Sequence, residues 1–391
     1  MNEVFVLDGV RTPFGRYGGA LASVRPDDLA CHVLRTLRQR NELDPGDVDE
    51  VILGAANQAG EDNRNVARMA VLLAGWPTSV PGSTVNRLCG SGLDAVMQAS
   101  RTIASGDASV IVAGGVESMS RAPWVLAKPA SGFPGRHETL HSTTLGWRLV
   151  NPSMPKQWTV TLGEATELLA DRYGIGRDRQ DEFALRSHQL AAKAWADGFY
   201  DDHVAPVPGT DLVADEAVRK DTSLERLARL KPSFRGDGTI TAGNASPLND
   251  GASAVLLADS AGADRHGRTP LARIAGRGDA GVDPDMFGIG PVKAAEIALR
   301  RAGIGWSDLS VVELNEAYAA QSLACLAEWP ELDPEIVNIH GGAIAIGHPL
   351  AASGGRLIAT VARELHRRGG GWGLAALCIG VGQGLAVVLE A

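Results

Sequence analysis

Cys89 is the residue with the clearest potential for chemistry. It lies in VNRLCGSGLDAV (residues 85–96), between a strand-like lead and the start of a helix of small residues. Unpaired N–H groups and the dipole at a helix N-terminus favour a thiolate, so we expect a lowered pKa for this thiol. Gly90 and Gly92 would let a substrate approach the backbone closely. The pattern suits a nucleophile, although most buried cysteines are simply small apolar residues.

A candidate base lies in the second half of the chain. His348 stands between glycine and proline in NIHGGAIAIGHPLAASGGR (338–356), just before a helix pattern. An imidazole held at the end of an element can take a thiol proton and then hydrogen-bond a developing oxyanion. His340, in the same stretch, is interpreted as a structural histidine.

Two more stretches carry candidate groups. Cys378 and Gly380 lie in LCIGVGQGLAVVLEA (377–391), where only seven residues follow the last glycine of the glycine run. That is too short for a dinucleotide-binding unit, so we predict a tight turn that exposes Cys378 and a backbone N–H. Asn315, in LNEAYAAQ, either holds a water or carbonyl or caps the next helix. Two thiols, an imidazole and amide dipoles suit Claisen condensation, or its reverse, on a thioester.

The whole-chain composition excludes several classes. The 391 residues include 37 basic and 46 acidic ones, for a net charge of −9, which argues against a nucleic-acid or anionic-membrane partner. Four cysteines without a C-x-x-C pair argue against a disulfide framework or a metal site. Neither a signal-peptide pattern nor an apolar run long enough to span a membrane is visible. We therefore expect a cytoplasmic protein.

Strand and helix patterns alternate, which predicts an α/β fold with a sheet layered by helices. The chain also repeats itself: 43–54 aligns with 304–315 at an offset of 261 residues, and 91–106 aligns with 353–368 at an offset of 262. Two matches at nearly one offset indicate a duplicated fold. The strand patterns cover 4–7, 50–54, 108–115, 252–258, 310–315 and 384–391, and the helix patterns 27–40 and 292–303.

The stretch between the halves differs in composition and is rich in Pro, Gly, Trp and His. We expect three parts: residues 1–119, a loop domain over 120–250, and residues 251–391. Within the loop domain, segment 218–238 has six basic and three acidic residues. This excess either receives phosphates or is a solvated helix face.

Eight stretches make nearly the whole chain resemble the thiolase family, the acetyl-CoA acyltransferases. The resemblance implies a duplicated five-layered αβαβα fold with an inserted loop domain, assembled as a homodimer or homotetramer. It implies acyl-CoA and CoA as substrates and no permanently bound cofactor. The stretches are VRTPFG, VNRLCGSGLDA, AGGVESMSRAP, TAGNASPLNDGA, GIGPV, LNEAYAAQ, GGAIAIGHPLAASGGR and CIGVGQG.

The resemblance also assigns roles. The family's nucleophile falls on Cys89, its histidine on His348 and its acid/base cysteine on Cys378. One oxyanion hole would combine His348 with a water held by Asn315, and the other would use the backbone N–H groups of Cys89 and Gly380.

Binding residues follow in the same way. Arg219 is the expected contact for the CoA phosphates, and Ser246 is expected nearer the pantetheine. Leu162 and Tyr318 stand where the family commonly has methionine and phenylalanine, and His340 stands where it commonly has asparagine. These three departures fall near the acyl group or the pantetheine arm and affect the expected acyl preference.

Segments 54–77 and 142–154 most resemble the β-ketoadipyl-CoA branch of the family, which implies 3-oxoadipyl-CoA as the substrate. Burying its distal carboxylate unpaired costs several kcal/mol, so a cation is required, and Arg148 is the first choice. Alternatively, Arg148 is structural and the enzyme is an acetoacetyl-CoA or general fatty-acid thiolase. The other cations of this region are Arg121, Lys128, Arg136, His137 and His141.

Two further classes compete with the thiolase interpretation. A decarboxylating ketoacyl synthase would pair its cysteine with two histidines, or with a histidine and an asparagine, and Cys378 argues against it. A non-catalytic protein that binds CoA or lipid would be expected to lose Cys89, His348 or Cys378, and all three are present.

Overall fold

The computed structural model describes residues 2–129, 131–133, 135 and 137–391. Its main sheet has the strand order β10-β11-β12-β9-β1-β8-β5-β3-β4, with β2 paired to β8, and β6 and β7 form a separate hairpin. The strands are β1 (Phe5–Arg11), β2 (Gly15–Arg16), β3 (Glu50–Gly54), β4 (Gly82–Val85), β5 (Val110–Ser118), β6 (Trp124–Leu126), β7 (Leu140–Ser142), β8 (Asn249–Ala258), β9 (Ala272–Gly281), β10 (Leu309–Leu314), β11 (Trp372–Ile379) and β12 (Gln383–Glu390).

The sheet has the same pattern on both sides of its centre. In the first half, β3 and β5 are parallel, while β5–β8 and β8–β1 are antiparallel. In the second half, β10 and β11 are parallel, while β11–β12 and β12–β9 are antiparallel. A short antiparallel ladder between β1 and β9 joins the halves. The duplication predicted from the two repeat offsets is therefore present in the fold.

The helices complete five layers. Helices α1 and α2 cover the first half-sheet, α3 and α11 lie between the two half-sheets, and α8 covers the second. Three apolar cores fill the four interfaces between these layers: one lies under α1 and α2, one packs α3 and α11 against both half-sheets, and one lies under α8. The helices are α1 (Pro26–Asn41), α2 (Val66–Leu73), α3 (Ser91–Ser105), α4 (Leu162–Tyr173), α5 (Arg177–Ala196), α6 (Leu224–Ala228), α7 (Ser260–Arg265), α8 (Gly290–Ala302), α9 (Ala319–Glu328), α10 (Ala343–Ile346) and α11 (Ser353–Arg368).

The two central helices meet at their N-termini through equivalent glycines of the repeat. A Cβ added to Gly92 would lie 2.0 Å from the carbonyl oxygen of Ala351, and one added to Gly354 would lie 2.0 Å from the backbone nitrogen of Leu93. Only glycine permits this approach. Gly90, for its part, packs against the side chain of Ile379. The expectation that Gly90 and Gly92 make room for a substrate was therefore wrong, because both glycines make room for the protein itself.

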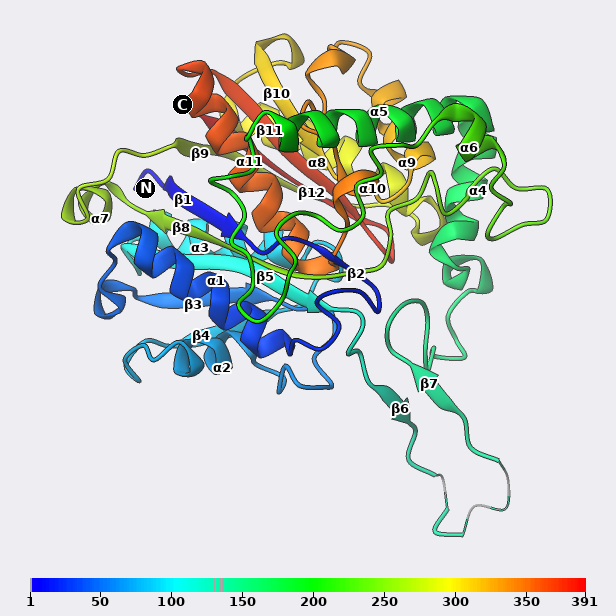
Figure 1. Cartoon of the computed structure of the whole chain (residues 1–391), viewed down its shortest axis with the longest axis horizontal. Coiled ribbons are helices and arrows are strands. Elements are labelled where there is room, and N and C mark those ends of the chain that lie inside the picture. Colours follow the sequence, from blue (N-terminus) through cyan, green and yellow to red (C-terminus); the bar gives the residue numbers. More distant parts are fainter. Residues whose placement is uncertain (1, 130, 134, 136) are drawn as a thin grey trace.

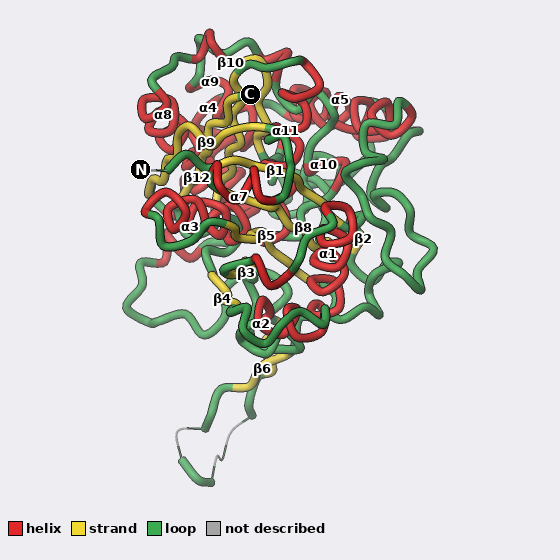
Figure 2. The backbone as a smooth tube through the Cα atoms, turned by 90° about the vertical axis from the view of Figure 1, so that its left-hand side faces the viewer, coloured by secondary structure: helices red, strands yellow, loops and turns green. Residues whose placement is uncertain are grey.

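The segment between the halves holds β6, β7, α4, α5 and α6. The β6–β7 hairpin projects away from the layered body (Figures 1 and 2), while α4–α6 lie against the second half. The division at 119/120 and 250/251 stays a prediction. Segment 218–238 is helical only over Leu224–Ala228, so it is not one long solvated helix. Among the described residues, every helix is too short or too polar to span a bilayer.

Candidate active site

Cys89 lies in the turn between β4 and α3. The preceding residue, Leu88, has φ +48°, a left-handed conformation that is costly for a non-glycine residue and gathers at functional sites. Ser91 holds this turn by accepting a hydrogen bond from the N–H of Arg87 (2.8 Å) and donating one to the carbonyl of Leu88 (2.6 Å). The sequence therefore closes a tight strand–turn–helix unit around the thiol.

The electrostatics of Cys89 differ from the expectation. Burial raises the pKa of its thiol to about 11, and the nearby charge of Glu117 adds to the rise. The backbone N–H of Gly380 opposes the rise by stabilising the thiolate. The expected lowering of the pKa was therefore wrong: at Cys89, lost solvation outweighs the stabilising N–H groups. The resting cysteine is a thiol and needs a base.

Gly380 lies in the tight turn between β11 and β12, where Cys378 pairs with Gly384 and Ile379 with Gln383. The predicted turn is thus present. Val381, next to Gly380, has φ +69°, a strained conformation for a β-branched residue. Cys378 itself is only 2% exposed, so the turn buries this thiol rather than exposing it.

His348 precedes α11 as Cys89 precedes α3. Its Nδ1 lies 2.7 Å from the Oγ of Ser353, and its backbone N–H donates to Oδ1 of Asn249 (2.8 Å). With Nδ1 donating to Ser353, Nε2 carries the free lone pair of a general base. Burial and the charge of Arg356 lower the pKa of the imidazole to about 3. The histidine is therefore neutral and able to accept a proton.

Asn315 faces the same imidazole from the end of β10. Its Nδ2 lies 3.5 Å from both ring nitrogens of His348, while its Oδ1 is buried without a hydrogen-bond partner among the described residues. Helix α9 begins later, with Tyr318 as its N-cap residue. The N-cap interpretation of Asn315 is therefore excluded, and the amide points to the site.

Cys378, Cys89 and Tyr318 lie near one another. Burial raises the pKa of the Cys378 thiol well above its usual range, and the nearby Cys89 adds to the rise. The phenol pKa of Tyr318 is also raised by burial, with both cysteines as neighbouring charges. Tyr318 makes edge contacts with Phe287 and with Phe234 of segment 218–238. The basic segment therefore reaches the rim of the cysteine pair.

A cavity of about 380 Å³ opens above Cys89. It unites Cys89, Gly380, Leu162 and Arg148, four of the predicted site residues, with Leu350, two positions after His348. The rest of its wall consists of Ala56, Asn57, Leu88, Glu117, Met119, Ala122, Thr143, Thr144, Leu145, Gly146, Trp147 and Val381.

The loop that carries Arg148 is held by two left-handed residues and a side-chain hydrogen bond. Gly146 and Leu149 have φ +83° and +51° and bracket Trp147 and Arg148 in a tight bend. The indole N–H of Trp147 donates to the carbonyl of Val160, just before α4, at 2.9 Å. The guanidinium of Arg148 forms no ion pair with the described residues. Arg148 is therefore a cation of the cavity wall that has no carboxylate partner among the described residues.

The other predicted cations lie elsewhere. Arg121 is paired with Glu61, Lys128 and His137 are exposed, and His141 lies on the β6–β7 hairpin. Arg136 falls outside the described residues.

The predicted CoA contacts lie outside the cavity wall. Arg219 is exposed. Ser246 donates its N–H to the carbonyl of Ala317, next to Tyr318, at 3.0 Å. His340 pairs with Glu364 at 3.0 Å and stacks on Phe199, as a structural histidine does.

Two residues at the site were missed from the sequence. Ser353 occupies the position equivalent to Ser91 in the repeat, and that equivalence was the available signal. Glu117 is a carboxylate at the end of an apolar strand, only 4% exposed. A charge in such a strand is a signal for a buried functional group.

Comparison with known proteins decides the family. A profile of the thiolase N-terminal domain matches residues 4–261, and one of the thiolase C-terminal domain matches residues 268–391. The chain belongs to the thiolase family. The predicted thiolase-like fold is thereby confirmed, as is membership of a family of acyltransferases.

Individual thiolases resemble the chain over its whole length. It is 53% identical to the 3-oxoadipyl-CoA/3-oxo-5,6-dehydrosuberyl-CoA thiolase of Escherichia coli, with all of both chains covered. It is 52% identical to a β-ketoadipyl-CoA thiolase of Pseudomonas aeruginosa, covering 100% of this chain and 99% of the relative. A structure of human mitochondrial 3-ketoacyl-CoA thiolase in complex with CoA superimposes with a TM-score of 0.94, at 38% identity, covering 100% of this chain and 98% of the human one.

Proposed function

We propose that this thiolase cleaves 3-oxoadipyl-CoA with CoA to give succinyl-CoA and acetyl-CoA. Cys89 attacks the 3-oxo carbon, the C2–C3 bond breaks, and acetyl-CoA leaves. Free CoA then takes the succinyl group from Cys89. The observation that carries the substrate assignment is that Arg148 lines the cavity that also contains Cys89 and forms no ion pair within the described part of the chain.

His348 acts as the general base of the first step. A thiol with a pKa of about 11 is a poor nucleophile at neutral pH, and an imidazole with a pKa of about 3 is neutral there. The proton therefore passes to Nε2 as the sulfur attacks, so that a free thiolate need not accumulate. Ser353 supports this role by holding Nδ1.

Two sets of donors suit the developing oxyanions. The backbone N–H of Gly380, close to the Cys89 sulfur, and the N–H of Cys89 itself would stabilise the alkoxide formed at C3. Asn315 and His348 would stabilise the thioester enolate of acetyl-CoA. The Oδ1 of Asn315 has no hydrogen-bond partner among the described residues. It can therefore accept a hydrogen bond from the water that is expected between Asn315 and the enolate oxygen.

Cys378 supplies the proton at carbon. Its raised pKa keeps it protonated at neutral pH, which is the state needed to protonate the acetyl-CoA carbanion once the C2–C3 bond has broken. Its place in an apolar cluster with Phe287 and Ala317 favours the neutral thiol. In the reverse reaction the same group removes the proton.

The distal carboxylate of the substrate would meet Arg148. A guanidinium held on a tight loop suits a bidentate contact with a carboxylate. The relatives named for 3-oxoadipyl-CoA support the choice. The competing function is an acetoacetyl-CoA or general 3-ketoacyl-CoA thiolase, in which Arg148 is merely structural.

CoA would lie along the face formed by segment 218–238, with Arg219 near its phosphates and Ser246 near the pantetheine. The contact between Phe234 and Tyr318 supports this path, because it brings the basic segment to the rim of the cysteine pair. We further propose a homodimer or homotetramer in the cytoplasm, where all four cysteines, free in the structure, would stay reduced.

The test is a thiolysis assay with 3-oxoadipyl-CoA, 3-oxohexanoyl-CoA and acetoacetyl-CoA. We expect the dicarboxylate to have a higher kcat/KM than its uncharged analogue of equal carbon number. Arg148→Ala should erase that preference and spare acetoacetyl-CoA, while Lys128→Ala, on the projecting segment, serves as the matched control. Equal cleavage of the two six-carbon substrates by the wild type would favour the general thiolase.

A further inference from the structure

Glu117 is a buried carboxylate whose hydrogen-bond partners, within the described residues, are all backbone N–H groups of two loops that are distant in sequence. It lies near the end of β5. Its Oε2 accepts the N–H of Ala56 at 3.0 Å and that of Ala351 at 3.4 Å, and its Oε1 accepts the N–H of Asn57 at 3.1 Å. One side chain therefore connects a loop of the first half of the fold with a loop of the second.

Both loops belong to the site. Ala351 lies three residues after His348, in the 3₁₀ turn Leu350–Ala352 that leads to Ser353. Ala56 and Asn57 line the cavity above Cys89. The carbonyl of Ala351 packs so closely on Gly115 of β5 that a Cβ there would lie 2.1 Å away. A displacement of this turn would therefore move His348 relative to Cys89.

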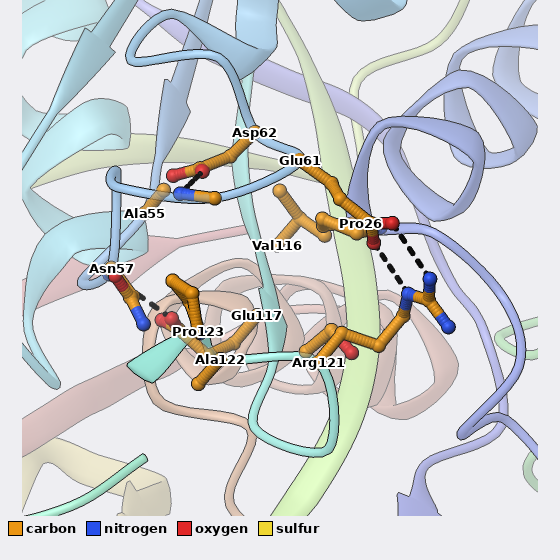
Figure 3. A pocket seen from close by; sticks show the side chains of 12 residues that line it. Pro26, Ala55, Asn57, Glu61, Asp62, Val116, Glu117, Arg121, Ala122 and Pro123 are labelled. Atoms are coloured by element: carbon orange, nitrogen blue, oxygen red, sulfur yellow. Dashed lines mark hydrogen bonds and ion pairs between the residues drawn. The ribbon is translucent and has the colours of Figure 1, made fainter. Parts of the chain in front are cut away.

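Glu117 also stands between two hollows. It lines the cavity above Cys89 and a smaller adjoining hollow shared with Asp62 and Arg121. In Figure 3 the carboxylate of Glu117 lies beside Asn57, whereas Arg121 reaches away to Glu61. No cation among the described residues pairs with Glu117, so only backbone N–H groups stabilise its charge.

We propose that Glu117 is a positioning residue for the acylation of Cys89. Its carboxylate fixes the Leu350–Ala352 turn, and through it His348, at the distance and angle at which the imidazole takes the thiol proton. The inference rests on the proposed function only for that proton transfer, not for the substrate, so its test uses acetyl-CoA.

The ionisation of Glu117 provides an independent readout. Burial, together with the charge of Asp62, raises its pKa to about 7. Cys89, which lines the same cavity, titrates near 11, and His348, which precedes the Leu350–Ala352 turn, near 3. Across the smaller hollow, the hydrogen bond from Arg121 lowers the pKa of Glu61. The pKa of Asp62 is also raised by burial, so Asp62 needs a control. Protonation of the Glu117 carboxylate removes hydrogen-bond acceptor capacity for the backbone N–H groups of the two loops. The rate of Cys89 acylation should therefore fall below neutral pH.

The experiment measures the single-turnover rate of acetyl transfer from acetyl-CoA to Cys89, by rapid quench, over a pH series. Glu117→Gln places an NH₂ donor against backbone N–H donors and so weakens the hydrogen bonds that hold the two loops. Glu167→Gln is the matched control: Glu167, on α4, is 1% exposed and accepts the N–H groups of Thr239 and Ile240 at 3.0 Å.

We expect Glu117→Gln to acylate about 10- to 100-fold more slowly, the cost of a misplacement of roughly 1 Å in a catalytic group, with little change in the half-saturating acetyl-CoA concentration. Glu167→Gln should acylate like the wild type. The acylation rate plotted against pH should show an inflection near pH 7 in both the wild type and Asp62→Asn, and Glu117→Gln should lack it.

Three results would overturn the proposal: an unimpaired acylation rate in Glu117→Gln, an equal loss in Glu167→Gln, or a wild-type profile without the inflection. The last result decides the matter even if Glu117→Gln does not fold. A chain that acylates normally but does not prefer 3-oxoadipyl-CoA would contradict the substrate assignment and leave the role of Glu117 intact.

Discussion

The resting state of Cys89 and His348 is open to a direct test by alkylation over a range of pH. The pKa of Cys89, about 11, exceeds the pKa of His348, about 3, by about 8 pKa units. At ~1.36 kcal/mol per unit, moving the thiol proton to the imidazole in the empty site costs about 11 kcal/mol before the attraction between the new charges is counted. The neutral thiol and neutral imidazole should therefore dominate.

Iodoacetamide reacts with the thiolate, so its rate reports this equilibrium. In a Cys378→Ala background, alkylation of Cys89, followed by peptide mass spectrometry, should rise about tenfold per pH unit from pH 7 to 10. Adding His348→Gln should leave this rate nearly unchanged while abolishing acylation by acetyl-CoA. A plateau below pH 9, or a steep loss of alkylation in His348→Gln, would reveal a resting thiolate–imidazolium pair and refute the reasoning.

Three further predictions each concern one substitution. Cys378→Ala should still acylate Cys89 from acetyl-CoA but lose carbon–carbon cleavage by about 10²–10⁴-fold; equal loss of both steps would contradict the division of roles. Arg219→Ala should raise the KM for CoA with little change in kcat, and should matter less for a pantetheine thioester without the nucleotide; an unchanged KM would count against the contact. Glu117, whose pKa rises from 4.5 to about 7 on folding, favours the native state below pH 4.5, and that contribution is lost as pH rises through 7. Between pH 4 and 8, the unfolding free energy of Glu117→Gln minus that of the wild type, both measured in urea, should therefore rise by about 3 kcal/mol. Parallel pH curves would show that Glu117 does not titrate in this range.

Much of the fold could be predicted from the sequence, because the chain keeps the hydrophobic patterns of its strands and helices and also an internal repeat. The strand pattern at 50–54 coincides with β3, and the helix patterns at 27–40 and 292–303 fall within α1 and close to α8. The repeat offsets predicted the equivalence of α3 and α11. Helix α5 was missed because its buried positions are small or polar, such as Ala184, Ser187 and His188, and give no apolar stripe.

The site was predictable in composition but not in electrostatics. Cys89 and His348 each precede a central helix, α3 and α11, and the N-termini of these two helices meet, as the duplication implies. The pKa of Cys89 was misjudged because the local motif displays the helix start but not the surrounding burial. Glu117 was missed because its partners, such as Ala351, are far away in sequence. Ser353 is only five residues from His348, and it was missed because its equivalence to Ser91 in the repeat was not used.

The most direct test of the account is to identify the acyl-enzyme. The protein is mixed with 3-oxoadipyl-CoA without free CoA, quenched and digested, and the modified peptide is identified by mass spectrometry. The account predicts a succinyl group on Cys89 and release of one equivalent of acetyl-CoA, with no adduct in Cys89→Ala. A succinyl group on another residue, or acetyl-CoA release by Cys89→Ala at the wild-type rate, would contradict it.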